Sequence, residues 1–317
     1  MKASQQFTTI DEQIKRLKSR GLSINNEETA YELLSTYVYF NIINGYKEPY
    51  IFKTEVSAQY IPGTTFEQIY SLFCLDHAIR NQILLLMLDL EEHLRSVTSY
   101  VIAESFGIKE EDYLKYKNYQ NRSSSNPRFA LPNILDSLKN ATLSNKNPIK
   151  YYRENYHNVP PWVLFKGVFL STLVNFIRLQ KPKQKSDIIV KMYDIKYESI
   201  DKYIKDLFTD TLFLCLEFRN LAAHGGRIYN YIPSSSIRVS LESEKILNIK
   251  ITNFANIHKV HSLGTLVCML DLFKRKTYSK SLKKVIESEI KKHCNIYPND
   301  LPYLLESTGI KNIIQTL

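Results

Sequence analysis

The chain has few of the residues that build stapled or phosphate-cradling folds. Its 317 residues include four cysteines, and these lie far apart with no C-x-x-C pair. That spacing argues against a disulfide framework and a zinc knuckle, and it indicates a reducing compartment. The nine glycines form neither a phosphate-binding loop nor a nucleophile elbow of the G-x-S-x-G type. We therefore expect a cytoplasmic protein without those two kinds of site.

Long apolar runs and metal-ligand clusters are also lacking. The first six residues lead into a polar helix rather than an apolar signal core, and the apolar run at 83–88 is too short to cross a bilayer. His258 and His261, with Cys268 downstream, have no fourth ligand at a suitable spacing. We expect no membrane partner, no metal and no cofactor.

What the chain does have is apolar and basic content. Hydrophobic residues make up 44% and aromatic residues 12%, which is ample for a buried core. The formal net charge is +10, which suits an anionic partner such as nucleic acid. The heavy use of Lys, Asn, Ile and Tyr expected of an AT-rich genome would give the same charge, so the charge alone assigns no partner.

Apolar residues at helical spacing predict a mainly all-α protein. One exception follows residue 230, where apolar and polar residues alternate around 243–245 and predict a small β-hairpin near 237–251. The predicted helices cover residues 10–20, 26–44, 64–107, 131–143, 149–156, 161–180, 187–193, 258–276 and 279–293. A basic connector is expected at 181–185, before the helix that starts at 187.

The longest predicted helix, 64–107, carries charged residues beside its apolar face. Asp76, Arg80, Glu91 and Arg95 are separated by steps of four, eleven and four, which keep nearly the same helical direction. These residues could flank a groove for RNA, or they could form two i,i+4 ion pairs. We favour the ion pairs, because an amphipathic helix must fill its polar face.

The candidate site lies where another helix ends. The helix that begins near residue 199 has a core stripe of Tyr203, Leu207, Leu214, Phe218 and Leu221, and it is expected to stop at the Gly225-Gly226 pair. Near that end stand Arg219, Asn220 and His224. Asn220 and His224 share a face, whereas Arg219 lies roughly 140° from His224 and must reach around the helix.

These three residue types suit the cleavage of RNA without a metal. A guanidinium can hold a phosphodiester, and an imidazole can move protons to or from the 2′-hydroxyl and the leaving oxygen. One histidine cannot easily do both. A two-fold dimer that joins two copies of this helix end would supply a second. The alternative is structural: Arg219 and His224 cap carbonyl groups and pair with Glu217.

Three stretches also carry a family resemblance. Arg219, Asn220 and His224 resemble the R-N-x-x-x-H form of the motif of HEPN ribonucleases, and the run from Arg219 to Asn230 resembles the longer signature of the Abi family of abortive-infection proteins (AbiD and AbiF). The stretches 72–99 and 159–163 are similar to two further segments of that family. Lys166 and Leu170 depart from its pattern, where an acidic residue and a glycine are expected. The matches run from about Tyr37 to Asn230.

The resemblance implies a HEPN-type helical bundle and an antiphage toxin that cleaves RNA to a 2′,3′-cyclic phosphate. It implies a single domain over 1–317, with a best-matched core at 64–230, the hairpin insertion within 231–257 and a C-terminal helical extension at 258–317. The expected partners are RNA, a second copy of the chain and a small structured RNA as antitoxin. A non-catalytic RNA-binding or protein-interaction module is the alternative function.

Four further residues are candidates for RNA binding. Arg227 and Tyr229 follow the helix end, and Lys150 and Arg153 lie in a segment that mixes cations with tyrosines. A solvated helix face would give the second pattern equally well. The same applies to the lysines of the helix at 279–293, which could bind phosphates or simply face water.

Overall fold

The computed structural model describes residues 7–53, 58–122, 124, 126–234 and 262–311. The fold is mainly helical, as predicted, and the principal helices are α1 (Ile10–Ser19), α2 (Glu27–Tyr39), α3 (Phe66–Phe106), α4 (Glu110–Tyr113), α5 (Leu131–Thr142), α6 (Ile149–Tyr156), α7 (Pro161–Leu164), α8 (Leu170–Arg178), α9 (Pro182–Met192), α10 (Lys202–Ala223), α12 (Leu263–Leu270), α13 (Thr277–Cys294) and α14 (Leu301–Thr308).

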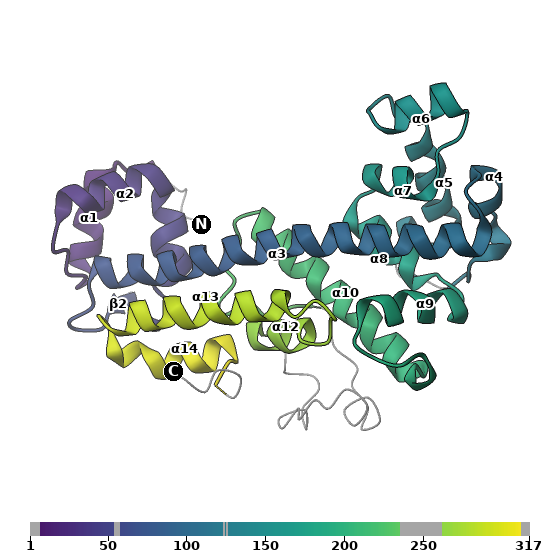
Figure 1. The fold of residues 1–317 in the computed structure, drawn as a ribbon. Helices are drawn as coiled ribbons and strands as arrows, with labels where there is room; N and C mark the ends of the chain where they lie inside the picture. Colours follow the sequence, from purple (N-terminus) through teal and green to yellow (C-terminus); the bar gives the residue numbers. More distant parts are fainter. Residues whose placement is uncertain (1–6, 54–57, 123, 125, 235–261, 312–317) are drawn as a thin grey trace.

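Helix α3 is the axis on which the other helices pack (Figure 1). It begins where the Thr65 hydroxyl accepts a hydrogen bond from the Gln68 amide, and it ends at Gly107, whose φ of 84° stops the helix. Its 41 residues span about 60 Å at 1.5 Å per residue. Helix α13 packs along its first half, α10 crosses its middle, and α7 and α9 pack against its second half.

The apolar face of α3 explains this role. Its buried positions include Leu72, Ile79, Ile83 and Leu90, each at most 2% exposed. The helix is long and apolar enough to cross a membrane by length and composition alone, but 44% of its apolar 18-residue stretch is buried inside the protein. Core helices of water-soluble proteins meet the same criterion, and the contacts of α3 with α13, α10 and α9 are those of a core helix.

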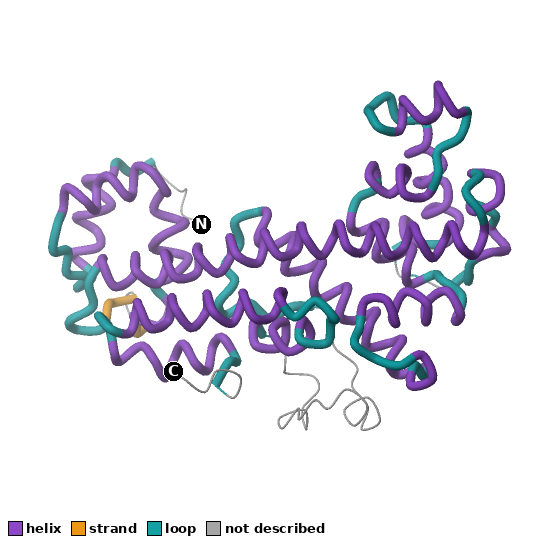
Figure 2. The backbone as a smooth tube through the Cα atoms, in the orientation of Figure 1, coloured by secondary structure: helices purple, strands orange, loops and turns teal. Residues whose placement is uncertain are grey.

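The N-terminal helices pack at the first end of α3. Helix α1 starts with a capping box, in which Thr9 and Glu12 exchange side-chain to backbone hydrogen bonds. Helix α2 continues into a π-helix, η1 (Phe40–Asn44). The short strands β1 (Ile51–Lys53) and β2 (Ala58–Tyr60) form an antiparallel pair that pairs Ile51 with Tyr60 (Figure 2). The hairpin expected near 237–251 lies outside the described residues.

Several expected boundaries were wrong, among them the end of the helix predicted over 258–276, since α12 stops at Leu270. The predicted helix 161–180 is divided into α7, a 3-10 helix (Phe165–Gly167) and α8, because the chain is extended at Val168 and Phe169. The extended Val168 exposes its carbonyl, which accepts a hydrogen bond from Arg95 at 3.0 Å. The expected basic connector 181–185 is instead mostly the first turn of α9, because Pro182 suits a helix start.

A buried polar network joins the C-terminal helices to α3 and to the N-terminal segment. The His293 ring contacts the Ser71 hydroxyl through Nδ1 and the Asp300 carboxylate through Nε2, both at 2.9 Å. The same carboxylate accepts hydrogen bonds from the Tyr50 hydroxyl and the Gln68 amide group. Burial alone would raise the pKa of Asp300, but the hydrogen bonds from His293, Tyr50 and Gln68 outweigh it and lower that pKa.

We predict that Asp300→Asn lowers the free energy of unfolding by about 1–3 kcal/mol at pH 7, because three polar groups lose a charged acceptor. A carboxyl group with a lowered folded-state pKa stabilises the fold above its unfolded pKa, and this contribution is lost as the pH falls. The difference between wild type and variant should therefore stay constant above about pH 5 and shrink below about pH 4. Urea denaturation across this pH range measures it, and a difference independent of pH would contradict the network.

Candidate active site at the end of α10

Helix α10 carries the candidate residues to its C-terminal end. It begins with Asp201, whose carboxylate accepts a hydrogen bond from the Ile204 amide at 2.8 Å. Of the predicted stripe, Leu207, Leu214 and Phe218 are fully buried. Tyr203 is half exposed, so its assignment to the core was wrong: in the first turn the next residue, Ile204, is the buried one.

The helix stops where the glycine pair predicted. The Gly226 amide donates to the Leu221 carbonyl and the Gly225 amide to the Ala222 carbonyl, which is the hydrogen-bond pattern of a Schellman motif. Gly225 has a φ of 71°, a left-handed conformation that only glycine adopts without strain. A Cβ on Gly226 would lie 2.1 Å from a Leu221 methyl carbon. His224 is the last residue before this turn, with its amide bonded to the Asn220 carbonyl.

The turn after His224 is held by two residues of α3. The Asp76 carboxylate is 0% exposed and accepts hydrogen bonds from the amides of Ile228 and Tyr229 at 2.9 and 2.6 Å. Arg80, one turn along, donates to the carbonyls of Gly225 and Gly226. Donor and acceptor groups of the turn are thus bound from one helix, which fixes the place of the helix end relative to α3.

Asp76 also accepts a hydrogen bond of 2.6 Å from the Tyr46 hydroxyl. Burial raises the pKa of Asp76, whereas its hydrogen bonds and the Arg80 guanidinium 3.9 Å away oppose that shift. Both ion pairs expected on α3 form, since Glu91 and Arg95 also lie within 2.5 Å. They are buried rather than solvated, however, and the Asp76–Arg80 pair binds backbone more closely than its own partner.

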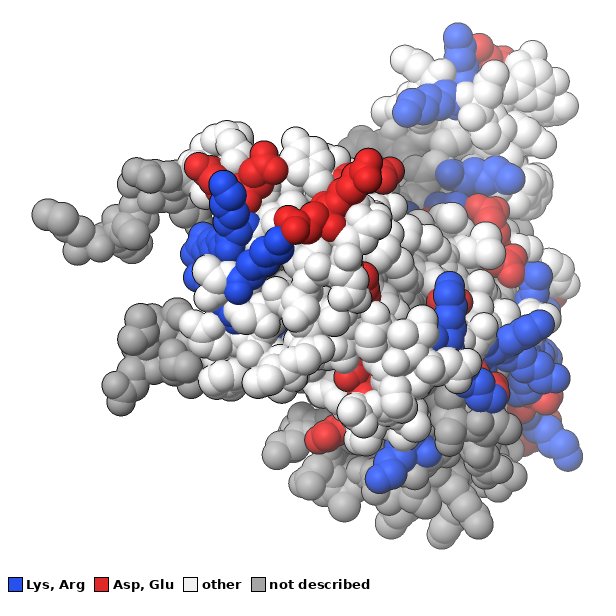
Figure 3. Space-filling model, turned by 90° about the vertical axis from the view of Figure 1, so that its left-hand side faces the viewer, with Lys and Arg blue, Asp and Glu red and all other residues white. Residues whose placement is uncertain are grey.

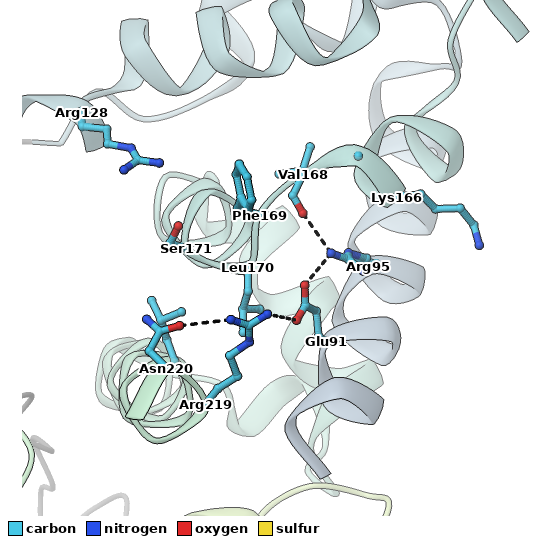
Figure 4. Close-up of a pocket in the computed structure, with 12 residues that line it drawn as sticks. Glu91, Arg95, Arg128, Lys166, Val168, Phe169, Leu170, Ser171, Arg219 and Asn220 are labelled. Carbon is cyan, nitrogen blue, oxygen red and sulfur yellow. Dashed lines mark hydrogen bonds and ion pairs between the residues drawn. The ribbon is translucent and has the colours of Figure 1, made fainter. Parts of the chain in front are cut away.

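Arg219 and Asn220 lie together at a pocket of about 410 Å³ between α3, α10 and the start of α8 (Figure 4). The Arg219 guanidinium lies 3.4 Å from the Asn220 side-chain oxygen and 3.8 Å from the Glu91 carboxylate. Glu91 in turn binds Arg95. Lys166 and Leu170, the departures from the family pattern, both line this pocket, although Lys166 directs its ammonium away from it (Figure 4).

His224 is exposed and does not line that pocket. Among the residues that the structure describes, its ring has no hydrogen-bond or ion-pair partner. Among the described residues, the ring caps no carbonyl group, and Arg219 forms an ion pair with Glu91. Glu217 instead accepts a hydrogen bond from the amide of Ser234. Within one chain the structure brings Arg219 and Asn220 together and leaves His224 on the open side of the turn.

A second hollow, of about 280 Å³, adjoins the turn itself. Gly225, Gly226 and Arg80 form part of its wall, and η1 contributes Phe40, which is 70% exposed. His77 also lines it, and burial together with the nearby Arg80 guanidinium lowers the pKa of this histidine. No residue near His77 in the sequence forms a motif with it, so the sequence did not identify this histidine as part of a hollow.

Comparison with known protein families agrees with the family resemblance of the three sequence stretches. A family model described as Abi-like protein matches residues 32–230, more than half of the chain. The chain belongs to the Abi-like family. No curated protein matches it, and no solved structure does. The matched segment starts slightly before the expected Tyr37 and ends, as expected, at Asn230.

The Abi-like segment ends beside a contact with helices that follow it in the sequence. The Tyr229 hydroxyl lies 3.0 Å from that of Tyr303 in α14. Tyr229, a candidate for RNA binding, is 0% exposed, and its ring is packed between Tyr46 and Tyr303. Arg227 donates to the Gly45 carbonyl at 2.5 Å and lies near Glu48, so it braces the turn against η1.

The other two RNA-binding candidates lie on α6, which Figure 1 places well away from the end of α10. Arg153 donates to the carbonyls of Thr142 and Ser144 and so caps the C-terminal end of α5. Lys150 is exposed. The lysines of α13 partly pair with carboxylates, as Lys283 does with Asp271 at 2.5 Å and Lys291 with Glu287 at 2.8 Å.

Positive charge is not gathered at the end of the molecule near α1 and α2. The face in Figure 3 has Lys and Arg next to Asp and Glu around a broad uncharged area. Among the described residues on this face, basic and acidic side chains are therefore mixed rather than separated. Among the described residues of the Abi-like chain, no group of three or more His, Cys, Asp and Glu could hold a metal ion.

We predict that Asp76→Asn lowers the free energy of unfolding by about 1–3 kcal/mol, since an amide nitrogen cannot accept the hydrogen bonds that one carboxylate oxygen accepts. Asp136→Asn is the matched control, because Asp136 is exposed and 3.8 Å from Lys139, a pair worth less than about 1 kcal/mol. Urea denaturation of both variants measures the difference. Equal, small losses would show that the turn is not held by Asp76.

Proposed function

We propose that this protein is a metal-independent endoribonuclease of the HEPN type and a cytoplasmic antiphage toxin like AbiD and AbiF. Membership of the Abi-like family supports the abortive-infection role. The observation that carries the catalytic part is His224: an exposed imidazole without a described partner, at a helix end fixed by Asp76 and Arg80. A side chain that serves only the fold would be expected to have a partner there.

The chemistry needs few groups. The 2′-hydroxyl of one nucleotide gives up its proton and its oxygen bonds to the adjacent phosphorus. The bond from phosphorus to the 5′-oxygen of the next nucleotide breaks, and that oxygen takes a proton. The products are a 2′,3′-cyclic phosphate and a 5′-hydroxyl. His224 moves protons, Arg219 stabilises the charge on the phosphate, and Asn220 positions the group by a hydrogen bond.

Arg219 can change partner without a large cost. Its side chain is 31% exposed, and its contact with Glu91 is 3.8 Å, longer than a hydrogen bond. Its Nε has no hydrogen-bond partner among the described residues. Glu91 remains bound to Arg95 when Arg219 turns away, so a phosphate can replace it as the partner of Arg219.

A second copy of the chain completes the proposed site. One imidazole must act as both base and acid, and in one chain His224 lies outside the pocket that Arg219 and Asn220 line. A two-fold axis near the turn would place two histidines and two arginines at one cleft. The exposed Phe40 beside the turn supports this, because exposed apolar side chains at such a place favour association.

We predict that His224→Asn abolishes cleavage of single-stranded RNA in the presence of EDTA and relieves toxicity in cells, while RNA affinity stays within about twofold. His157→Asn is the matched control, since His157 is also an exposed histidine next to a helix end and its left-handed conformation suits asparagine. Gel analysis of the products, with a test for the cyclic phosphate, measures activity. Cleavage by His224→Asn at the wild-type rate would remove His224 as the catalyst.

The shared site makes a separate prediction. If one cleft needs both histidines, only dimers of two wild-type chains are active. Co-expression of equal amounts of wild type and His224→Asn should then give about a quarter of the activity that the same total amount of wild-type protein gives. Chains that act alone would leave about half. Co-expression with His157→Asn should leave the activity unchanged. A residual activity of one half would contradict the shared site and leave the proposed nuclease activity standing.

A non-catalytic module that binds RNA or a protein is the second candidate. The arginines at the pocket beside α10 favour RNA over a protein partner, and binding there needs no proton transfer. RNA binding by wild type without cleavage under any condition would select this function. We further propose that a small structured RNA restrains the toxin. Co-expression of a small RNA encoded next to the gene tests this proposal, and loss of toxicity is the expected result.

A further inference from the structure

The pocket between α3, α10 and α8 is lined by several residues that have no role in the proposed cleavage step. Besides Arg219 and Asn220, its wall contains Arg128, Phe169 and Ser171. Arg128 reaches into it from the opposite side, and Figure 4 shows its guanidinium directed toward Phe169. A volume of about 410 Å³ falls in the range of small-ligand sites.

The charge in this pocket favours an anion. Its wall contains three arginines, Arg95, Arg128 and Arg219, and one carboxylate, Glu91. That carboxylate is buried and bonded to Arg95, which balances its charge. Arg128 is exposed and has its described contact with the ring of Phe129 rather than with an acid. The guanidinium nearest to solvent is thus available to a phosphate.

Two further features describe what else the ligand contains. Phe169 is 76% exposed, although it lies between the buried Val168 and Leu170. It precedes the first turn of α8 without capping that helix, so the first amides of α8, at Leu170 and Ser171, have no side-chain cap where they border the pocket. Uncapped amides favour a phosphate group, and an exposed aromatic face favours a nucleobase.

We propose that this pocket is a subsite for one nucleotide of single-stranded RNA. The base stacks on Phe169, and a phosphate lies between Arg128 and the amide end of α8. The inference rests on the proposed function, because the nucleotide held here is a neighbour of the one whose phosphate Arg219 holds. The subsite would help to determine which RNA is cut, because single-stranded RNA can present an unpaired base to the ring and duplex RNA cannot.

The test uses full-length protein with His224→Asn as the parent, so that the RNA stays intact. Fluorescence anisotropy measures the binding of a 12-nucleotide single-stranded RNA in EDTA, and of the same RNA with abasic positions. Phe169→Leu should weaken binding of the normal RNA by roughly fivefold or more. It should leave binding of the abasic RNA unchanged, because the leucine removes only stacking. Arg128→Gln should weaken both by a similar factor.

Matched controls separate the pocket from general effects. Arg122→Gln removes the same charge six residues away, outside the pocket, and Phe7→Leu removes a ring that is also largely exposed. Both should bind like the parent. If Phe169→Leu and Arg128→Gln also bind like the parent, or if the loss at Phe169 is as large with abasic RNA, the subsite is wrong. Cleavage by the wild-type background, measured separately, decides the proposed nuclease whichever way binding turns out.

Discussion

The whole arrangement depends on one buried carboxylate. Asp76 lies inside the protein, on the helix that forms the axis of the fold, and binds two successive amides of the turn that follows α10. A buried charge is costly unless it is fully hydrogen-bonded, and Asp76 meets this requirement with backbone, with Tyr46 and with Arg80. Because those amides cannot move without leaving the charge unpaired, the helix end has one place relative to α3.

This rigidity explains how an exposed side chain can be chemically useful. His224 is open to solvent, yet its backbone is held by the Schellman hydrogen bonds and by the contacts of Arg80 with the next two carbonyls. A catalytic group needs a fixed position more than it needs burial. Two hollows lie in this region, one lined by Arg219 and Asn220 and one lined by His77, Phe40 and the two glycines of the turn.

Helices beyond the family segment take part in this support. Tyr229 reaches α14 through Tyr303, and Asp300 ties the start of α14 to Tyr50 and to α3 through Gln68. The C-terminal helices therefore stabilise the turn from behind without contributing a proposed catalytic group. Arg128 and Phe169, the residues proposed to hold a phosphate and a base, lie instead in the segments that precede α5 and α8, within the matched residues.

The sequence by itself determined the local features. Apolar periodicity identified α3 and α10, and the cap at Thr65 and the stops at Gly107 and Gly225 follow from backbone preferences that act within a few residues. The motif also located Arg219, Asn220 and His224. Only the tertiary structure decided what each group faces. Arg227, Tyr229 and Arg153 resemble RNA-binding residues in the sequence, yet η1, α14 and α5 occupy them. Phe169 and Arg128, 41 positions apart, carry no sequence signal, because their proximity arises from packing between elements, which residue spacing along one helix cannot encode.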